Sequence, residues 1–376
     1  MNEERNNEAV FRHLRVAGTP REVGRKEAEH LLRCGPEAAA LWPAADGPMR
    51  AGTREAVTEA LRAFERHCPW VNEEIRGFAD ALGRKPEDVV HYSFSHVARG
   101  SCSHFAVLPA KTADGHMAAG RSYEYSEEDD KRLTSLRMEG CHAHLGFSLL
   151  LFGRYDGIND KGLSVTMSMG LPMVESSAGG FRFWMIVRIL LDTCADVEEA
   201  LERLQGLPMS GYPNLVLADR GGHAALVELH DDVRAVRRIG PGDPDGLLGS
   251  TNHYRLPGME TRVRNRMRQS VERYEAIERA LRPERIDRAA LRGLLSAHTP
   301  DGLACHYYKE WLGTLWSCLY DLTAGAAEIC FGSPLANPWR TFVPAVPENA
   351  AGWEGEDEYR ALFPQRDAPP TAWERV

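Results

Sequence analysis

Residues 100–125 read GSCSHFAVLPAKTADGHMAAGRSYEY, and the pattern of the chain changes where they begin. After Gly100, short runs alternate between apolar and polar residues, as β-strands do. Asp114-Gly115 is a typical hairpin signal between the first two of these strands. Before Gly100, apolar spacing and the Pro and Gly signals predict three helices, over 20–33, 53–66 and 69–83, and a short fourth helix that starts at Pro86-Glu87-Asp88.

The rest of the chain repeats this alternation between strand-like and helix-like stretches. Helical spacing returns over 182–206 and 259–296, and the tail from Pro334 looks irregular. Turn signals join the strands directly, without helical crossovers, which argues against a doubly wound parallel sheet. The sequence therefore predicts an α+β layered fold. The expected strands are 103–108, 116–121, 143–150, 163–169, 213–219, 224–229, 233–238, 313–320 and 326–332.

Composition and charge exclude several classes of function. The 376 residues are 43% hydrophobic and carry a formal net charge of −9, which argues against a nucleic-acid binder. The start of the chain lacks a secretory signal and no apolar run is long enough to cross a membrane, so we expect a cytoplasmic protein without a membrane partner. None of the eight cysteines forms a C-x-x-C pair, and Cys141-His142-Ala143-His144 lacks further ligands at zinc spacing. We expect no metal.

Cys102 lies at the switch from helix to strand, and its neighbours make it a candidate nucleophile. A cysteine at the start of a strand is by itself more often a buried core residue. The hairpin, however, can return Arg121 to the side of Cys102, and a nearby arginine lowers the pKa of a thiol. Glu124 could then hold the Arg121 guanidinium through two hydrogen bonds. An Arg121–Glu124 surface ion pair without function is the alternative.

Several segments resemble, in the same order, the penicillin acyltransferase-like branch of the N-terminal-nucleophile hydrolases, which is related to the choloylglycine hydrolases. Residues 100–124 resemble that family's nucleophile strand, hairpin and G-R-N-x-D turn. Ser250-Thr251-Asn252-His253-Tyr254 resembles its T-N-H-[FY] signature. The other matching segments are Val16–Gly24, Asp156–Leu163, Asn214–Glu228, Thr314–Ser317 and Gly332–Pro334.

The sequence departs from the family pattern at four positions. Ser122 and Glu124 stand where Asn and Asp are usual, and Asp160 stands where Glu is usual. Ser101 precedes the cysteine where the penicillin acyltransferases have Gly. The last departure bears on self-cleavage rather than on the fold.

The resemblance implies a four-layer αββα sandwich and a precursor that cleaves itself at the Ser101–Cys102 bond. Residues 1–101 would form a helical pro-segment that stays bound as an α-subunit, and residues 102–376 would form the catalytic β-subunit. The freed α-amine of Cys102 would be the base, because its ordinary pKa of about 7.7–8.0 suits proton transfer near neutral pH. Cys102 would hydrolyse or transfer an acyl group through a thioester.

The resemblance also implies roles for particular residues. Asn252 is the expected side-chain donor to the oxyanion, and the backbone N–H of Met169 is a weaker candidate. Arg121 and Glu124 would hold the nucleophile region, and Arg262 would be a further catalytic arginine. Asn214 matches a family position. The implied substrate is a small-molecule amide, for example an N-acyl amino compound, a β-lactam-type side chain or a peptide-derived intermediate. No cofactor is implied.

Two other functions remain open at this point. His104 shares a strand face with Cys102, so an unprocessed, papain-like Cys–His hydrolase is one alternative. A histidine bonded within the core is the plainer interpretation of His104. A non-catalytic scaffold that binds small molecules is the other alternative. The oligomeric state is equally open, and a homodimer of processed heterodimers is one arrangement.

Overall fold

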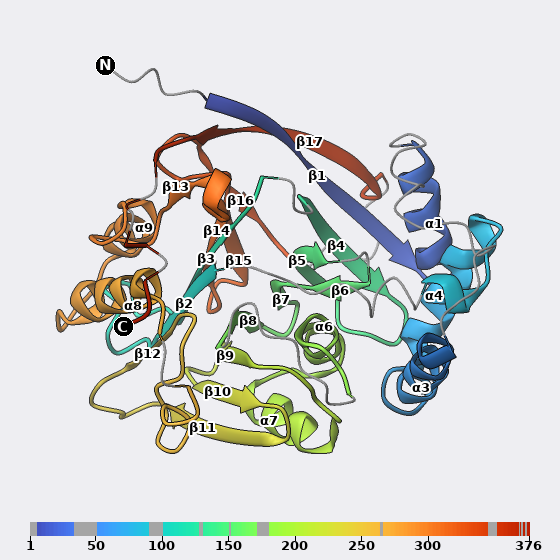
Figure 1. The fold of residues 1–376 in the computed structure, drawn as a ribbon, viewed down its shortest axis with the longest axis horizontal. Coiled ribbons are helices and arrows are strands. Elements are labelled where there is room, and N and C mark those ends of the chain that lie inside the picture. The colour runs from blue at the N-terminus through green and yellow to red at the C-terminus, as the bar shows by residue number, and fades with distance from the viewer. Residues whose placement is uncertain are drawn as a thin grey trace.

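Two β-sheets stack on each other, and helices cover their outer faces (Figure 1). The structure, a computed structural model of the chain, describes residues 6–33, 51–89, 101–127, 131–149, 152–170, 180–263, 266–344, 352–367, 369, 371–372 and 374–376. No helix in these ranges is long and apolar enough to span a lipid bilayer.

The larger sheet has ten strands within the described ranges, in the order β11-β10-β9-β8-β7-β5-β4-β1-β17 with β6 paired to β5. β1 runs parallel to β4 and antiparallel to β17, so backbone hydrogen bonds hold it along both edges. The strands are β1 (Asn6–Gly18), β4 (Arg132–Met138), β5 (His144–Leu149), β6 (Gly153–Arg154), β7 (Asp156–Asn159), β8 (Leu163–Met169), β9 (Pro213–Asp219), β10 (Ala224–His230), β11 (Val233–Ile239) and β17 (Gly355–Pro364).

The smaller sheet carries the candidate nucleophile on its second strand. Its order is β12-β2-β3-β14-β15-β16, with β13 paired to β14. β2 and β3 form the hairpin expected from the sequence, and Cys102 lies directly opposite Tyr123. The strands are β2 (Ser101–Val107), β3 (Ala118–Tyr125), β12 (Leu247–Ser250), β13 (His306–Tyr307), β14 (Leu312–Asp321), β15 (Ala326–Phe331) and β16 (Trp339–Phe342).

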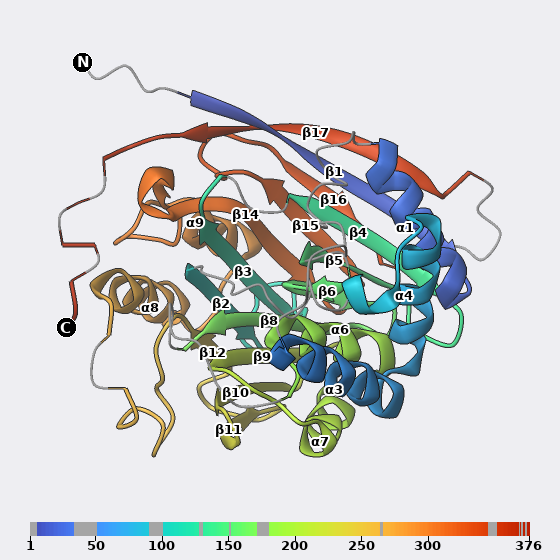
Figure 2. The same cartoon turned by 45° about the vertical axis from the view of Figure 1, so that its right-hand side comes forward.

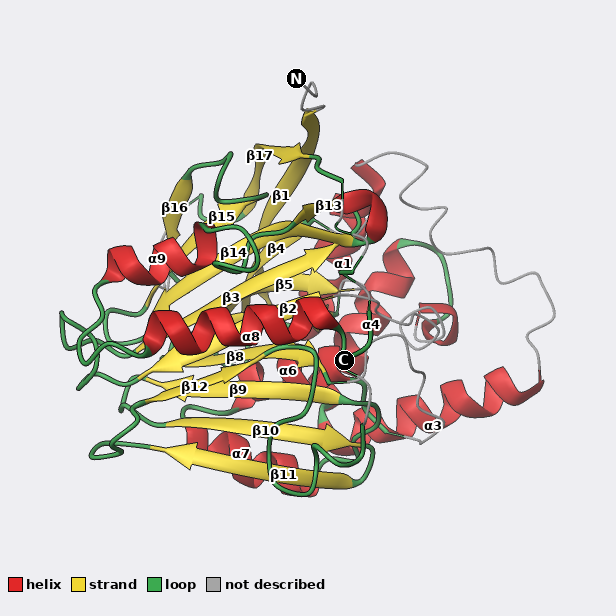
Figure 3. Ribbon diagram, turned by 60° about the vertical axis from the view of Figure 1, so that its left-hand side comes forward, coloured by secondary structure: helices red, strands yellow, loops and turns green. Residues whose placement is uncertain are grey.

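Helices on both sides complete four layers. α8 and α9 pack on the smaller sheet, where Ile277 and Leu294 meet Phe105 and Leu319, and α6 and α7 lie beyond the larger sheet (Figure 3). This helix–sheet–sheet–helix order confirms the predicted α+β, four-layer αββα fold. The helices are α1 (Pro20–Arg33), α3 (Ala51–His67), α4 (Pro69–Ala81), α6 (Phe183–Thr193), α7 (Val197–Gly206), α8 (Arg268–Leu281) and α9 (Arg288–Ser296), with a 3-10 turn η1 (Tyr308–Glu310).

α1 packs on β1, α4 packs on α1, and α3 packs on α4 (Figure 2). α1 and α4 cross closely because each has a glycine at the crossing: a Cβ on Gly24 would lie 1.8 Å from the Glu74 carbonyl oxygen, and one on Gly77 would lie 2.0 Å from that of Arg21. Any larger residue would separate the two helices. This packing gives a physical reason for Gly24 in the segment that resembles the family's opening motif.

Aromatic side chains fill the space between the sheets next to Cys102. The Trp316 ring stacks between Phe147 and Tyr123, with centroids 4.1 and 4.2 Å away, and Tyr155 lies 4.7 Å from Tyr123. Offset stacking of this kind contributes beyond the area that the rings bury. The strand β2, which carries Cys102, therefore packs on a layer of stacked aromatic rings.

Two long strands contradict the sequence prediction. β1 lies in the segment predicted to be helical, and β17 lies in the tail predicted to be irregular. They pair with each other, and cross-strand ion pairs such as Arg12–Glu356, at 2.6 Å, replace part of the apolar alternation that marks a strand. In addition, the helical stretch expected from residue 259 begins only at Arg268, because residues 259–262 form turns.

Candidate active site

Alternation along β2 sends neighbouring side chains to opposite faces of the smaller sheet. His104 contacts Thr166 of the larger sheet, with 2.9 Å between Nδ1 and Oγ1, so His104 and Cys102 face the space between the sheets. Ser101 and Ser103 face α8 instead, where Gln269 and Arg273 contact their hydroxyl groups. The thiol and the polar groups of α8 thus approach the start of β2 from opposite sides.

The backbone of Cys102 is held on both of its polar groups. Its N–H donates to Oδ1 of Asn252 at 2.8 Å, and its carbonyl oxygen accepts from Nη1 of Arg273 at 2.7 Å. Arg273 Nη2 also donates to Asn252 Oδ1 at 2.9 Å. All three side chains are buried. The structure therefore brings Asn252 to Cys102, as predicted, across 150 residues of sequence.

The orientation of the Asn252 amide follows from its neighbours. Two donors face Oδ1, so the nitrogen must point the other way, and Nδ2 donates to the Met169 carbonyl oxygen at 3.0 Å. Asn214 holds the same loop by donating to the carbonyl oxygens of Thr251, at 3.0 Å, and His253, at 3.3 Å. Asn252, Met169 and Asn214 are thereby brought together, with Asn214 one step away from Cys102.

Arg121 lies on the same face as Cys102, but Glu124 does not hold it. The two residues are three positions apart on β3, and an odd separation along a strand places side chains on opposite faces. The prediction that Glu124 fixes the guanidinium is therefore wrong. Arg121 Nε instead donates to Asp156 of β7, and Asp156 also accepts from the indole N–H of Trp316 at 3.0 Å.

Glu124 belongs to the polar group on the α8 side. It accepts from the Ser122 hydroxyl and lies 3.4 Å from Nη1 of Arg273. Burial raises the pKa of Glu124 to about 7, although Arg273 opposes that shift. Its carboxyl group is therefore poised to change protonation near neutral pH, close to the backbone of Cys102.

Opposing effects act on the pKa of the Cys102 thiol. Burial raises the pKa of the Cys102 thiol, whereas the positive charge of Arg121 acts in the opposite direction and Glu124 adds to the rise. An uncleaved, buried thiol is a weak nucleophile unless a base takes its proton. Activation of this sulfur thus depends on a nearby proton acceptor.

His104 is poorly placed to be that acceptor. Both of its ring nitrogens face hydroxyl groups of β8, Nδ1 at 2.9 Å from Thr166 and Nε2 at 3.2 Å from Ser168. Burial keeps the pKa of His104 well below its usual value. The contacts match a core histidine that links the two sheets.

The sequence prediction missed Arg273, Gln269 and Asp156. Arg262 lies in an exposed turn before α8, whereas Arg273 lies against Cys102 and Asn252. A signal was present, since Gln269, Arg273 and Ile277 recur every four residues and so share the buried face of α8. An arginine on the apolar face of an amphipathic helix requires a buried partner.

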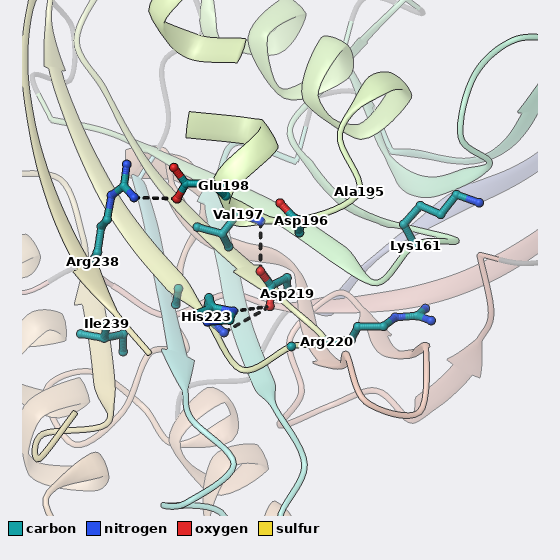
Figure 4. A pocket seen from close by; sticks show the side chains of 12 residues that line it. Lys161, Ala195, Asp196, Val197, Glu198, Asp219, Arg220, His223, Arg238 and Ile239 are labelled. Atoms are coloured by element: carbon teal, nitrogen blue, oxygen red, sulfur yellow. Dashed lines mark hydrogen bonds and ion pairs between the residues drawn. The ribbon is translucent and has the colours of Figure 1, made fainter. Parts of the chain in front are cut away.

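A separate open pocket of about 630 Å³ lies between the start of α7, the β9–β10 turn and the end of β11 (Figure 4). Pro109 near this turn follows the far end of β2, so about 20 Å of strand separates the pocket from Cys102. Asp219 at its wall already accepts from the Val197 N–H at 3.0 Å, and Arg238 pairs with Glu198 at 2.6 Å. These contacts explain its polar groups without a ligand.

Residues 111–336 match the family described as acyl-coenzyme A:6-aminopenicillanic acid acyl-transferase. The chain belongs to this family. The match covers more than half of the sequence and confirms the resemblance drawn from the motifs. It includes Arg121, Asp156, Asn252 and Arg273, while Cys102 lies just before it. Membership indicates chemistry on acyl groups, by hydrolysis or by transfer.

Solved structures with a similar course of the chain are distant in sequence. A mutant of the conjugated bile acid hydrolase from Clostridium perfringens is 13% identical, with a TM-score of 0.41 over 71% of this chain and 98% of its own. Penicillin V acylase from Agrobacterium tumefaciens is 14% identical, with a TM-score of 0.43 over 68% of this chain and 90% of its own. The N-acylethanolamine-hydrolyzing acid amidase ortholog of Caenorhabditis elegans is 12% identical, with a TM-score of 0.42 over 59% of this chain and 93% of its own. No curated protein matches the sequence.

Proposed function

We propose that the chain cleaves its own Ser101–Cys102 bond and then uses Cys102 as an N-terminal nucleophile on small-molecule amides. The observation that carries this proposal is the setting of the Cys102 backbone. Its nitrogen, the leaving group of such a cleavage, is 2.8 Å from Asn252 Oδ1, and its carbonyl is 2.7 Å from Arg273. A core cysteine with no chemical role would not require two buried polar side chains on its backbone.

The processing step uses only atoms of the chain and one water. The Cys102 sulfur attacks the Ser101 carbonyl carbon, and its proton passes to the Cys102 nitrogen as the C–N bond breaks. The Ser101 acyl group is then joined to sulfur as a thioester. Water hydrolyses the thioester and returns a proton to sulfur, which leaves a carboxyl group on Ser101 and an α-amine on Cys102.

The new α-amine supplies the base that the precursor lacks. A peptide nitrogen cannot accept a proton at neutral pH, whereas an α-amine has an ordinary pKa of about 7.7–8.0. Asn252 Oδ1 would keep the amine beside the sulfur. The thiolate attacks the substrate carbonyl, the amine product leaves with the proton, and water or a second nucleophile takes the acyl group from the thioester.

The remaining polar groups would stabilise charge along this path. Arg121 would favour the thiolate from the inner face, and Arg273 would balance Glu124 on the α8 face. Asn252 has a second N–H besides the one given to Met169, and that hydrogen could donate to the oxyanion together with the Met169 backbone N–H. We assign no role in turnover to Arg262 or His104.

Residues 1–101 would remain with residues 102–376 after cleavage. β1 is hydrogen-bonded between β4 and β17, so its release would break both ladders. Glu74 of α4 is also paired with Arg188 of α6 at 2.7 Å, with both side chains fully buried. The segment ahead of the cleaved bond is thus a permanent subunit in this proposal.

Intact-mass measurement of purified wild type and Cys102→Ala tests the proposal. We expect two fragments from wild type, ending at Ser101 and beginning at Cys102, and one full-length chain from the variant. Cys330→Ala, which removes another buried strand cysteine, is the control and should be cleaved normally. An uncleaved wild type whose Cys102 resists iodoacetamide would contradict the proposal.

A further inference from the structure

Two side chains of α8 lie on either side of the bond between Ser101 and Cys102. Gln269 Nε2 donates to the Ser101 hydroxyl at 3.2 Å, and Arg273, one helical turn later, donates to the Cys102 carbonyl at 2.7 Å. With Asn252 on the intervening N–H at 2.8 Å, the peptide is held before, at and after this bond. Each of these side chains is buried.

The direction of the Gln269 amide is fixed by Arg273. Gln269 Oε1 accepts from Nη2 of Arg273 and also from its Nε, at 3.1 Å. An arginine has only donors, so the oxygen must face it and the NH₂ group must face Ser101. The Ser101 hydroxyl is therefore connected through Gln269 to the same guanidinium that binds the Cys102 carbonyl.

We propose that Ser101 and Gln269 position the bond that is cleaved, so that their contact accelerates self-processing and plays no part in later turnover. The inference rests on the proposed self-cleavage. Ser101 ends the upstream segment once the bond is broken, so this contact links the two sides of the bond only in the precursor. Restricting both sides of a reacting bond lowers the entropy cost of reaching the attack geometry.

This role also accounts for the departure at Ser101. The penicillin acyltransferases that the sequence resembles have Gly before the nucleophile, where no side chain can be bound. Here a side chain is present, is buried, and has a dedicated donor on α8. The chain would thus gain a positioning contact at a place where a glycine leaves the backbone freer.

The test follows cleavage during cell-free synthesis, stopped with acid at successive times and read by intact mass. Ser101→Ala and Gln269→Met each remove one partner, and the double variant completes a double-mutant cycle. Ser317→Ala is the matched control, because its buried hydroxyl on β14 makes no hydrogen bond to another described residue. We expect Ser101→Ala to slow cleavage by about threefold to tenfold, the effect of one hydrogen bond, and Ser317→Ala to leave it unchanged.

Turnover of fully cleaved protein separates positioning from general damage. Fully cleaved Ser101→Ala should hydrolyse the probe N-phenylacetyl-4-nitroaniline at the wild-type rate. Its Cys102 should also react with iodoacetamide at the wild-type rate. In the Gln269→Met background, Ser101→Ala should have no further effect on cleavage. The inference is overturned if Ser101→Ala is cleaved at the wild-type rate, if the two changes add, or if cleaved Ser101→Ala is impaired. If the wild-type protein is never cleaved, the proposed self-cleavage itself is wrong. That outcome differs from the three above, in which wild type is cleaved.

Discussion

Two buried groups in this molecule are built from the same three residue types in the same arrangement. In the inner group, Arg121 Nε donates to Asp156, which also accepts from the Trp316 indole at 3.0 Å. In the helix group, Arg188 Nε donates to Asp192 at 2.7 Å, and Asp192 accepts from the Trp70 indole at 2.8 Å. Both arginines are completely buried.

The two groups differ at the far end of the guanidinium. Arg188 donates from Nη1 and Nη2 to Glu74, at 3.3 and 2.7 Å, and from Nη1 to the Phe152 carbonyl at 2.8 Å. Arg121 has a single weak contact from Nη1 to the Ser122 carbonyl at 3.4 Å, and its Nη2 makes no hydrogen bond to another described residue. Arg121 also acts on the Cys102 thiol, where it opposes the rise in pKa that burial causes.

We infer that this difference separates an ion pair used for structure from one used in the proposed chemistry. A buried donor left without a partner costs free energy, and such groups persist in native proteins where the chemistry uses them. The helix group satisfies its guanidinium and ties α4, in the N-terminal segment, to α6. In the proposed mechanism, the inner group leaves positive charge available to a thiolate at Cys102.

The largest expected effect is on stability, from Arg188→Met. Removing this guanidinium leaves Glu74 and Asp192 buried without their partner, and breaking a buried pair in this way costs about 3–5 kcal/mol. We therefore expect a loss of that size in the free energy of unfolding, measured with denaturant. The folded fraction should keep the wild-type rate of iodoacetamide labelling at Cys102. A normal stability would show that the helix group does not hold the segments together.

Arg121→Met should change the reactivity of Cys102, which Arg188→Met leaves unaltered. The positive charge of Arg121 favours the thiolate, so its loss should raise the pKa of Cys102 and slow labelling by iodoacetamide about tenfold at pH 7.5. The midpoint of the labelling rate against pH, read by mass at Cys102 in folded protein, measures the shift. Arg188→Met is the control and should keep the wild-type midpoint. Equal midpoints in both variants would remove Arg121 from the thiol's surroundings.

Sequence reasoning found the parts of the site that lie near one another along the chain. Cys102 and Arg121 sit on one hairpin, and the turn signal at Asp114-Gly115 was enough to pair them. Asn252 was identified as a site residue only from the resemblance to the family. Asp156 was missed because only the stacking of the two sheets brings it to Arg121, and Trp316 was missed because its strand, β14, pairs with β3 from a distant part of the sequence. No local pattern encodes either contact.

Other errors were avoidable from the sequence. The two-residue period of a strand already separates Arg121 from Glu124, and the helical period already places Gln269 and Arg273 on one face of α8. The choice of Arg262 came from the resemblance without that check. For the fold, the neighbouring central strands β8 (163–169) and β9 (213–219) were predicted to the residue. β1 and β17 were missed because charged residues, such as Arg12 and Arg15 in β1 and Glu356 and Glu358 in β17, interrupt the apolar alternation that marks a strand.

The smallest expected effect compares two buried carboxyl groups, that of Glu124 on the α8 side of Cys102 and that of Asp192 in the helix group. Burial raises the pKa of Glu124 to about 7, whereas the pKa of Asp192 is lowered to about 2 because Arg188 and His144 outweigh the effect of burial. Glu124 therefore binds a proton more tightly in the folded chain than in the unfolded chain, where its pKa is about 4.3. Its contribution to stability is present at low pH and is lost as the pH rises toward 7. Asp192 has the opposite sign, since its contribution is present above about pH 4 and is lost as the pH falls toward 2.

Glu124→Gln and Asp192→Asn make this contrast measurable. Between about pH 4.5 and 7, the free energy of unfolding of wild type should decline relative to Glu124→Gln, because the variant has no carboxyl group to ionise at that position. Over the same range, the difference between wild type and Asp192→Asn should stay constant, since Asp192 is ionised in both folded and unfolded chains. Denaturant unfolding at half-unit steps of pH gives both differences. If the difference in the free energy of unfolding between wild type and Glu124→Gln does not change with pH, the Glu124 carboxyl has an ordinary pKa. The proposed contrast between Glu124 and Asp192 would then be wrong.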